Sequence, residues 1–114
     1  MKYQVELTDE AGEFLESLPP KIEAKARRAI NLLKEFGYLL SEPHSKKLKS
    51  VDNLHELRVK AGTDICRLFY FFWKEKIYIV TSGYIKKDNK TDVKQIDKAV
   101  RIMKEFKEQE NEKN

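Results

Sequence analysis

Residues 65–73 read ICRLFYFFW, the most hydrophobic run of this 114-residue chain. A short run so rich in aromatic side chains is typical of a buried strand. The stretches LHELRVK at 54–60 and YIVTSGYI at 78–85 also show the two-residue period of strands, and the connections contain only AGTD and KEK. Because short connections join antiparallel neighbours, we expect Leu54–Lys60, Ile65–Trp73 and Tyr78–Ile85 to form an antiparallel sheet.

A helical hairpin is expected before this sheet. YQVEL at 3–7 alternates as a short first strand, and the Pro19-Pro20 pair ends one helix and begins the next. Gly37 is suited to cap the second helix at its C-terminus. Apolar residues recur at the helical period through that second helix: Ile22, Ala26, Ala29, Ile30, Leu33 and Phe36.

A last helix is expected after the sheet, whereas the stretch 38–53 is irregular. Four apolar residues share one face of this helix: Val93, Ile96, Val100 and Met103. Residues 109–114 are polar throughout, so we expect a frayed tail after a single domain of residues 1–108. The expected order is β-α-α-β-β-β-α, an α+β fold with helices packed on one face of an antiparallel sheet.

The charge and the cysteine content limit the class of protein. Charged residues make up 37% of the chain and the net charge is +4, a basic excess that suits a nucleic-acid or acidic-protein partner. The single cysteine, Cys66, excludes an internal disulfide and fits a reducing, cytoplasmic location, with the thiol as a small buried hydrophobe. The N-terminus lacks the apolar core of a signal peptide and no stretch approaches a membrane span, so no membrane association is expected.

The register of the first two sheet strands decides what the arginines face. A slip by one residue would mix apolar and charged positions on each face, which sheets avoid. We therefore expect Lys60 to face Ile65 across the AGTD turn. One face then carries the mostly apolar pairs Val59 with Cys66, Leu57 with Leu68 and His55 with Tyr70. The other carries Lys60 with Ile65, Arg58 with Arg67 and Glu56 with Phe69.

Two arginines that face each other destabilise a sheet. An anion bound between Arg58 and Arg67 would relieve this, because guanidinium groups match phosphate geometry. Alternatively, Arg67 pairs with a carboxylate at the edge of the core or extends its charged end to solvent. Gly83 on the third strand would leave room for a ligand beside Arg67.

Lysine clusters flank the two arginines in the sequence. They are Lys46, Lys47 and Lys49 before the sheet, and Lys86, Lys87 and Lys90 after it. Each cluster alone is also compatible with ordinary solvated surface. Together with the arginines and the aromatic residues Phe69 and Tyr84, they indicate a positive bowl suited to phosphate contacts and base stacking along a single RNA strand.

The chain lacks the usual catalytic motifs. It has no cluster at metal-ligand spacing, no glycine-rich phosphate loop and no nucleophile elbow, so neither a metal nor a cofactor is expected. His55 is placed on the buried face, whereas His44, in a basic loop, could act as a general acid or base. Phosphodiester chemistry here would depend on arginine and lysine to stabilise charge, with a lysine, a tyrosine or the RNA itself moving the proton.

Residues 54–106 resemble the RelE/ParE superfamily of bacterial toxins, in its HigB-like, phage-derived branch. The motifs that carry the resemblance are ELR at 56–58, ICRLFYFF at 65–72 and GYIKKDNKTDVKQIDKA at 83–99. The resemblance implies the toxin of a type II toxin–antitoxin pair, which enters the ribosomal A site and cuts mRNA without a metal, through attack of a 2′-hydroxyl on its own phosphate. It also implies a small antitoxin as partner, usually a helix-turn-helix DNA-binding protein.

The resemblance also implies roles for individual residues. Arg67 would stabilise the phosphate in the transition state, Arg58 would bind the same phosphate and Lys87 would assist the leaving group. The expected RNA-binding residues are Lys86, Lys90, Lys47, Lys49, Lys60 and Tyr84. Some members carry a histidine or tyrosine where this chain has Asp88 and Asn89, which leaves the proton donor open. A ParE-like inhibitor that binds DNA gyrase without catalysis, or an inactive binding domain, is the alternative.

Overall fold

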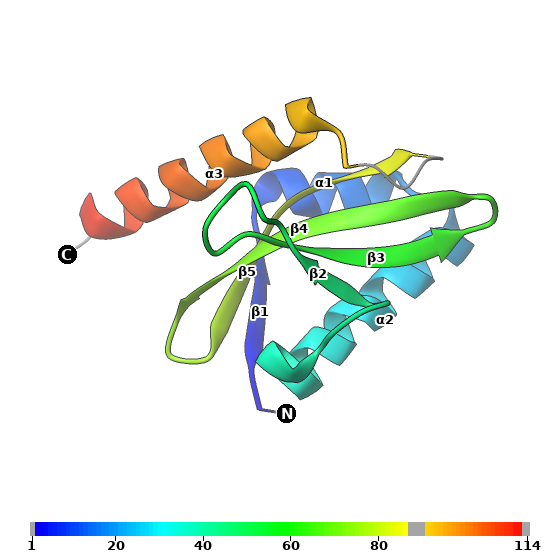
Figure 1. Ribbon diagram of the computed structural model, residues 1–114, viewed down its shortest axis with the longest axis horizontal. Coiled ribbons are helices and arrows are strands. Elements are labelled where there is room, and N and C mark those ends of the chain that lie inside the picture. Colours follow the sequence, from blue (N-terminus) through cyan, green and yellow to red (C-terminus); the bar gives the residue numbers. More distant parts are fainter. Residues whose placement is uncertain (1, 87–90, 113–114) are drawn as a thin grey trace.

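Five strands form one mixed sheet, in the order β1-β5-β4-β3-β2, in the computed structural model, which describes residues 2–86 and 91–112 (Figure 1). The strands are β1 (Gln4–Leu7), β2 (Ser45–Lys47), β3 (His55–Ala61), β4 (Asp64–Lys74) and β5 (Ile77–Lys86). The helices are α1 (Asp9–Ser17), α2 (Pro20–Phe36), the short 3-10 helix η1 (Gly37–Leu39) and α3 (Val93–Glu112). The predicted α+β fold, with an N-terminal helical hairpin and a C-terminal helix, is confirmed.

The sheet differs from the expected one in two details. β1 pairs with β5 in parallel, so the sheet is not fully antiparallel. The chain leaves β1 through the helical hairpin and reaches β5 only after three further strands, so no tight turn sets their relative direction. The second detail is β2, which lies within the stretch expected to be irregular and pairs with β3. Its three residues, SKK, are too few to show a period.

The predicted register of β3 and β4 is confirmed. Arg58 lies directly across from Arg67, and Lys60 lies across from Ile65. Each strand therefore sends alternate side chains to opposite faces of the sheet. Leu57, Val59, Cys66 and Leu68 reach the core under the helical hairpin, as the sequence predicts.

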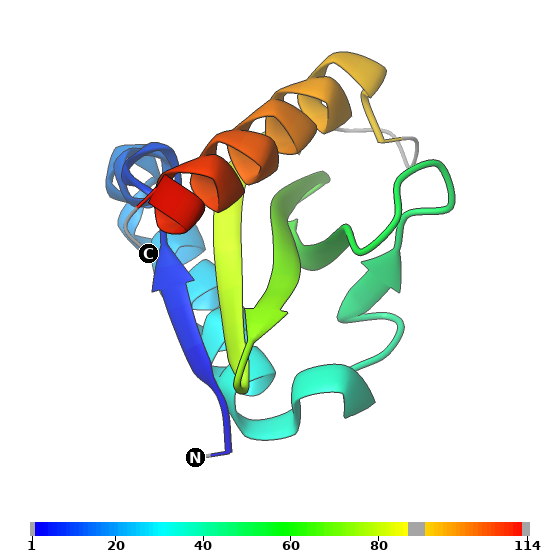
Figure 2. The same ribbon diagram turned by 90° about the vertical axis from the view of Figure 1, so that its left-hand side faces the viewer.

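The helices cover both faces of the sheet, and this corrects the prediction of a single covered face (Figure 2). α1 and α2 pack on the face that carries Leu68 and Tyr70. α3 packs on the opposite face, where Ala99 lies in a cluster with Phe69 and Met103 in a cluster with Phe71. β4 is apolar on both of its faces, which explains why ICRLFYFFW is an almost unbroken hydrophobic run.

The ends of the helices follow local chemistry. Thr8 caps α1, because its hydroxyl oxygen accepts the backbone N–H of Ala11 at 3.1 Å. Gly37 ends α2 at a φ of +53°, and a Cβ at this position would collide with the Tyr3 ring. Residues 109–112 belong to α3 and not to a frayed tail. Within residues 2–86 and 91–112, no helix has the length and apolar character needed to cross a membrane.

Candidate functional site

Three rows of side chains cross the α3 face of the sheet near the turn between β3 and β4. Directly paired residues present their side chains on the same face. The pairing therefore brings together five of the predicted site residues, Arg58, Arg67, Lys60, Lys86 and Tyr84. The rows are Lys60–Ile65–Lys86, Arg58–Arg67–Tyr84 and Glu56–Phe69–Ser82, with Lys46 of β2 beside Glu56.

Glu56 supplies a negative charge between the two arginines. Its Oε1 lies 3.3 Å from Nε of Arg58, and its Oε2 lies 3.8 Å from Nε of Arg67. The Thr91 hydroxyl donates a hydrogen bond to the same Oε2 at 2.9 Å. Of the arrangements considered for Arg67, the structure therefore contains the one in which a carboxylate of the chain lies beside it.

The segment before α3 covers part of this charged centre. The backbone N–H of Asp92 donates to the Tyr84 hydroxyl at 2.8 Å, and the Arg67 guanidinium carbon lies 5.8 Å from the centre of the Tyr84 ring. Arg67 and Glu56 are 0% exposed, whereas the Arg58 side chain is 21% exposed. The expected open bowl is therefore wrong at Arg67, because the apolar residues of this face are covered by α3 and the segment that leads into it.

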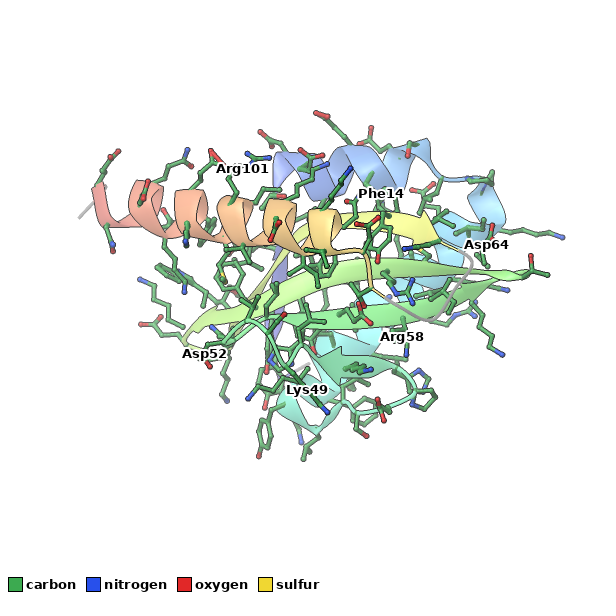
Figure 3. The ribbon with its side chains drawn as sticks, turned by 45° about the horizontal axis from the view of Figure 1, so that its top comes forward. Phe14, Lys49, Asp52, Arg58, Asp64 and Arg101 are labelled. Atoms are coloured by element: carbon green, nitrogen blue, oxygen red, sulfur yellow. The ribbon has the colours of Figure 1, made fainter. Side chains whose placement is uncertain are left out.

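A groove of about 530 Å³ adjoins Arg58, the β3 side chain labelled in Figure 3, at the edge of the sheet. β2 is too short to cover all of β3, and its pairing ends near Arg58, whose backbone N–H donates to the His44 carbonyl at 2.9 Å. α2 forms the other wall. The described side chains that line the groove include no carboxylate, and the basic ones are Lys25, Arg28, His44, Arg58 and Lys60.

Lys25 and Arg28 are site residues that the sequence analysis missed. Together with Lys21 they recur at spacings of four and three residues, which places all three on one side of α2. This basic stripe on an otherwise ordinary amphipathic helix is the signal that could have found them. The stripe alone does not predict a binding site, because the strand edge that it faces is formed by residues about 30 positions further along the chain.

The remaining predicted residues lie elsewhere. Lys47 pairs with His55 and so belongs to the opposite face from Arg58. Burial, and after it the positive charge of Lys47, lower the pKa of His55. Lys49 is exposed on the loop after β2. Lys87 and Lys90 lie outside the described residues.

Two smaller expectations can be compared with the structure. Gly83 pairs with Leu68 and faces the helical hairpin, where a Cβ would lie 2.6 Å from Cε2 of Phe14. The predicted ligand space beside Arg67 is therefore wrong, because the Phe14 ring fills the room that Gly83 leaves. Cys66 is buried as predicted, and burial raises its pKa to about 11.

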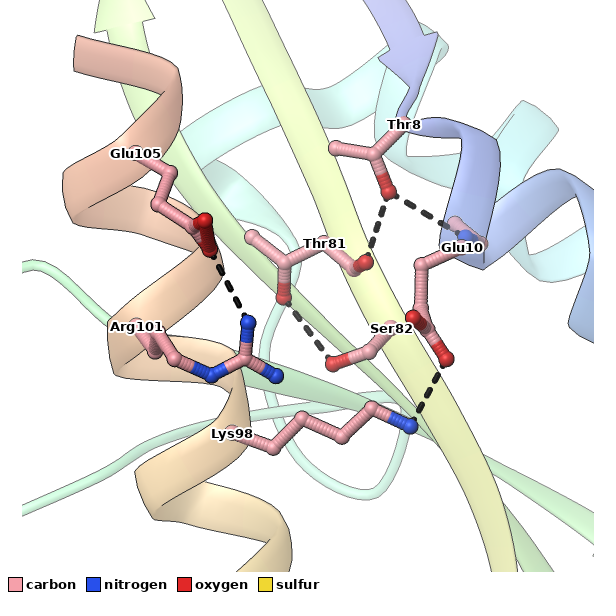
Figure 4. A network of polar contacts seen from close by, with 8 residues as sticks. Thr8, Glu10, Thr81, Ser82, Lys98, Arg101 and Glu105 are labelled. Atoms are coloured by element: carbon pink, nitrogen blue, oxygen red, sulfur yellow. Dashed lines mark hydrogen bonds and ion pairs between the residues drawn. The ribbon is translucent and has the colours of Figure 1, made fainter. Parts of the chain in front are cut away.

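Polar contacts link α1 both to α3 and to β5 (Figure 4). Nζ of Lys98 lies 2.7 Å from Oε2 of Glu10 and links α3 to α1. The Thr8 hydroxyl donates to the backbone oxygen of Thr81 at 2.7 Å and links the start of α1 to β5. The Lys98–Glu10 ion pair therefore connects α1 to the helix that follows the Thr91–Asp92 segment over Arg67.

A family model described as "Phage derived protein Gp49-like (DUF891)" matches residues 13–104. The chain belongs to this Gp49-like family. The match includes both arginines of the site, and the predicted phage-derived origin of the family is confirmed. No curated protein matches this Gp49-like chain.

Solved structures of RelE proteins share the fold of the Gp49-like chain. A double mutant of the Escherichia coli toxin RelE in the free state has a TM-score of 0.65 and 18% identity, over 89% of this chain and 97% of that one. The archaeal RelE–RelB complex from Pyrococcus horikoshii OT3 gives 0.53 and 21%, over 80% and 100%. The toxin–antitoxin complex RelBE2 from Mycobacterium tuberculosis gives 0.54 and 22%, over 77% and 100%. The Gp49-like chain therefore has the RelE toxin fold.

Proposed function

We propose that the protein is the toxin of a type II toxin–antitoxin pair and a ribosome-dependent endoribonuclease that cuts mRNA in the A site. The observation that carries this proposal is the Arg58–Arg67 pair, which lies on one sheet face beside the row that carries Lys60 and Lys86, with Arg58 lining a groove of basic side chains. Membership of the Gp49-like family and the RelE fold support it.

The chemistry proposed needs charge stabilisation more than covalent help from the protein. A ribose 2′-oxygen loses its proton and attacks the adjacent phosphorus, and the 5′-oxygen of the next nucleotide leaves and takes up a proton. The products are a 2′,3′-cyclic phosphate and a free 5′-hydroxyl. Negative charge grows on the phosphate oxygens on the way, and preorganised cationic donors stabilise it.

The exposure of the arginines suggests how they divide the work. Arg58 lines the groove and is partly exposed, so it is the arginine that contacts the phosphate first. Arg67 contacts RNA only when the segment around Thr91 moves. Until then Arg67 contributes positive charge behind Arg58, and both are positioned by Glu56. Lys60 and Lys86 bind neighbouring phosphates of the RNA as flexible point charges. The planar guanidinium of an arginine instead binds a single phosphate with two hydrogen bonds.

Proton transfer is assigned to two candidates. His44 lines the same groove as Arg58 and lies in the turn immediately before β2. An imidazole there can accept the 2′-hydroxyl proton. Lys87 remains our candidate for assisting the leaving group. The partner proposed is a cognate helix-turn-helix antitoxin in the same cytoplasm, in line with the two similar structures that are toxin–antitoxin complexes.

The test is primer extension on mRNA during cell-free translation, with the wild type, Arg58→Ala, Arg67→Ala and the exposed control Lys104→Ala side by side. The wild type and Lys104→Ala should cut within codons only when ribosomes are present. Arg58→Ala should lower the cleavage rate by roughly 100-fold or more, the usual effect of removing one oxyanion donor. A folded wild type that makes no cuts but inhibits DNA supercoiling by gyrase would overturn the nuclease in favour of a ParE-like inhibitor.

A further inference from the structure

An aromatic pocket lies on the other face of the sheet from Arg67. It has a volume of about 460 Å³, within the usual range for small-molecule sites, and lies where α2 gives way to η1. Strands β3, β4 and β5 contribute to it as well as η1 and Tyr3, the residue before β1. Six of the side chains that line it carry aromatic rings: Tyr3, Tyr38, His55, Tyr70, Phe72 and Tyr78.

The floor of the pocket is a packed set of rings. His55 stacks on Tyr70 with 5.2 Å between ring centres and an angle of 18° between the planes. Tyr78 meets the edges of Tyr70 at 5.6 Å and of Phe72 at 5.4 Å. The Tyr70 hydroxyl lies 2.6 Å from the Ser45 hydroxyl, a hydrogen bond that fixes the ring. A preformed aromatic floor of this kind is suited to a flat ligand.

The rim of the pocket is apolar and open to solvent. Tyr38 is 78% exposed, the highest value among the large hydrophobic side chains that the structure describes as exposed. Among the described residues, seven large hydrophobic side chains are exposed. Four of them lie at this end of the molecule, namely Phe36, Tyr38, Leu39 and Phe72. A gathering of exposed apolar side chains on a small protein marks a binding surface.

The charge of the pocket selects an anionic ligand. Lys76 lines it, and Lys47 acts on His55 from the neighbouring strand β2. No carboxylate is among the described side chains that form the lining. Burial and Lys47 lower the pKa of His55, so its ring is neutral near pH 7 and offers one donor and one acceptor. A purely aliphatic peptide would gain little from two lysines and from four tyrosine hydroxyl groups.

We propose that this pocket binds one unstacked nucleobase of single-stranded RNA, with Tyr38 stacking on the base and Lys76 and Lys47 contacting its phosphate. Aromatic stacking with lysines along the backbone is how proteins bind single strands. The inference rests on the proposed function, since it names a second RNA contact of the same toxin. It lies on the opposite face of the sheet from Arg58, so base binding there can be measured apart from cleavage.

The test is an NMR titration of the full-length Arg58→Ala chain, which has lost cleavage under the proposed function, with adenosine 5′-monophosphate and with a six-nucleotide 2′-O-methyl RNA that cannot be cut. We expect the resonances of Tyr38, Phe72 and Lys76 to shift. Tyr38→Ala and Lys76→Gln in the same background should weaken binding roughly tenfold, the scale of one stacked base. Val93→Ala is the control, because Val93 is an exposed apolar residue at the start of α3 that does not line the pocket.

The outcomes separate this inference from the proposed function. If the wild type cuts mRNA and these resonances stay still at millimolar nucleotide, the base pocket is overturned and the nuclease stands. If the nucleotide binds at Tyr38 and the wild type cuts nothing, the pocket stands and the nuclease is overturned. If a purified antitoxin shifts the same resonances while neither nucleotide nor RNA does, the pocket is a protein-docking site and the inference is wrong.

Discussion

Glu56 lies between Arg58 and Arg67, and its carboxylate contacts both guanidinium groups from a fully buried position. Burying an ion pair is costly in itself, because both charges lose their water. Removing one member of a buried pair costs more, since it leaves charge without its counter-charge in a medium of low polarity. The chain therefore tolerates two arginines on facing strands only with this carboxylate in place.

Glu56→Gln should lower the free energy of unfolding by about 3–5 kcal/mol, because it removes the negative charge from a buried cluster. Urea denaturation of the purified protein measures this. Glu23→Gln is the matched control, since it breaks an exposed Glu–Arg contact with Arg27 on α2 that should be worth only about 0.3–0.5 kcal/mol. Equal losses in the two variants would show that Glu56 does not hold the arginines.

The half-buried His55 should make stability depend on pH. Its pKa is lowered below the ordinary value of 6.5, so the unfolded chain binds more protons than the folded chain. Stability is then highest above pH 6.5 and falls over the pH range below it. Urea midpoints across this window should show the fall, and His55→Gln should reduce it. A fall that survives His55→Gln would contradict this origin.

At the residue scale, the sequence predicted which residues of β3 and β4 pair, but it did not predict which of their side chains other segments bury. The register that sets Arg58 across from Arg67 follows from strict alternation in two adjacent strands, a local property. The burial of Arg67 depends on Thr91 and Asp92, which lie more than 20 positions away and reach it only through the tertiary fold. Lys47 was misplaced for a similar reason, because three residues of strand do not reveal which face each one takes.

At the scale of helices and strands, too, local features were predictable and tertiary packing was not. The helices were predictable from their periods, but the side of the sheet that α3 covers was not, because β4 offers apolar faces on both sides. The packing of α1 on β5 depends on one close contact. The Phe14 ring of α1 occupies the space that Gly83 leaves, so this glycine serves helix–sheet packing and not ligand binding.

Two glycine substitutions should therefore have opposite effects. Gly83→Ala places a Cβ 2.6 Å from Cε2 of Phe14 and should destabilise the fold by about 1–3 kcal/mol through overpacking. Gly12→Ala, within α1, meets nothing within 4 Å and should stabilise it by about 0.5–1 kcal/mol through helix propensity. Thermal melts followed by circular dichroism should move in opposite directions. A Gly83→Ala melt at or above the wild-type temperature would contradict this packing.

For the whole molecule, the net charge of +4 matters less than its placement. The groove beside Arg58 carries cations from α2 and from β3, with no acidic side chain among its described lining. Elsewhere the basic residues are often matched by acids, as with Lys98 and Glu10 or Arg101 and Glu105. A nucleic acid that binds this protein should therefore release its counterions mainly at the groove.

This placement can be measured as a salt dependence. In a plot of log affinity against log salt for an uncleavable single-stranded RNA, Lys25→Gln with Arg28→Gln should weaken binding and make the slope shallower by about 0.7 for each charge removed. Arg27→Gln with Lys104→Gln is the control, since it changes the net charge equally at exposed residues outside the groove lining. Fluorescence anisotropy at several salt concentrations measures both slopes. If the control pair reduces the slope as much as the groove pair, RNA is attracted by overall charge and the groove is not its path.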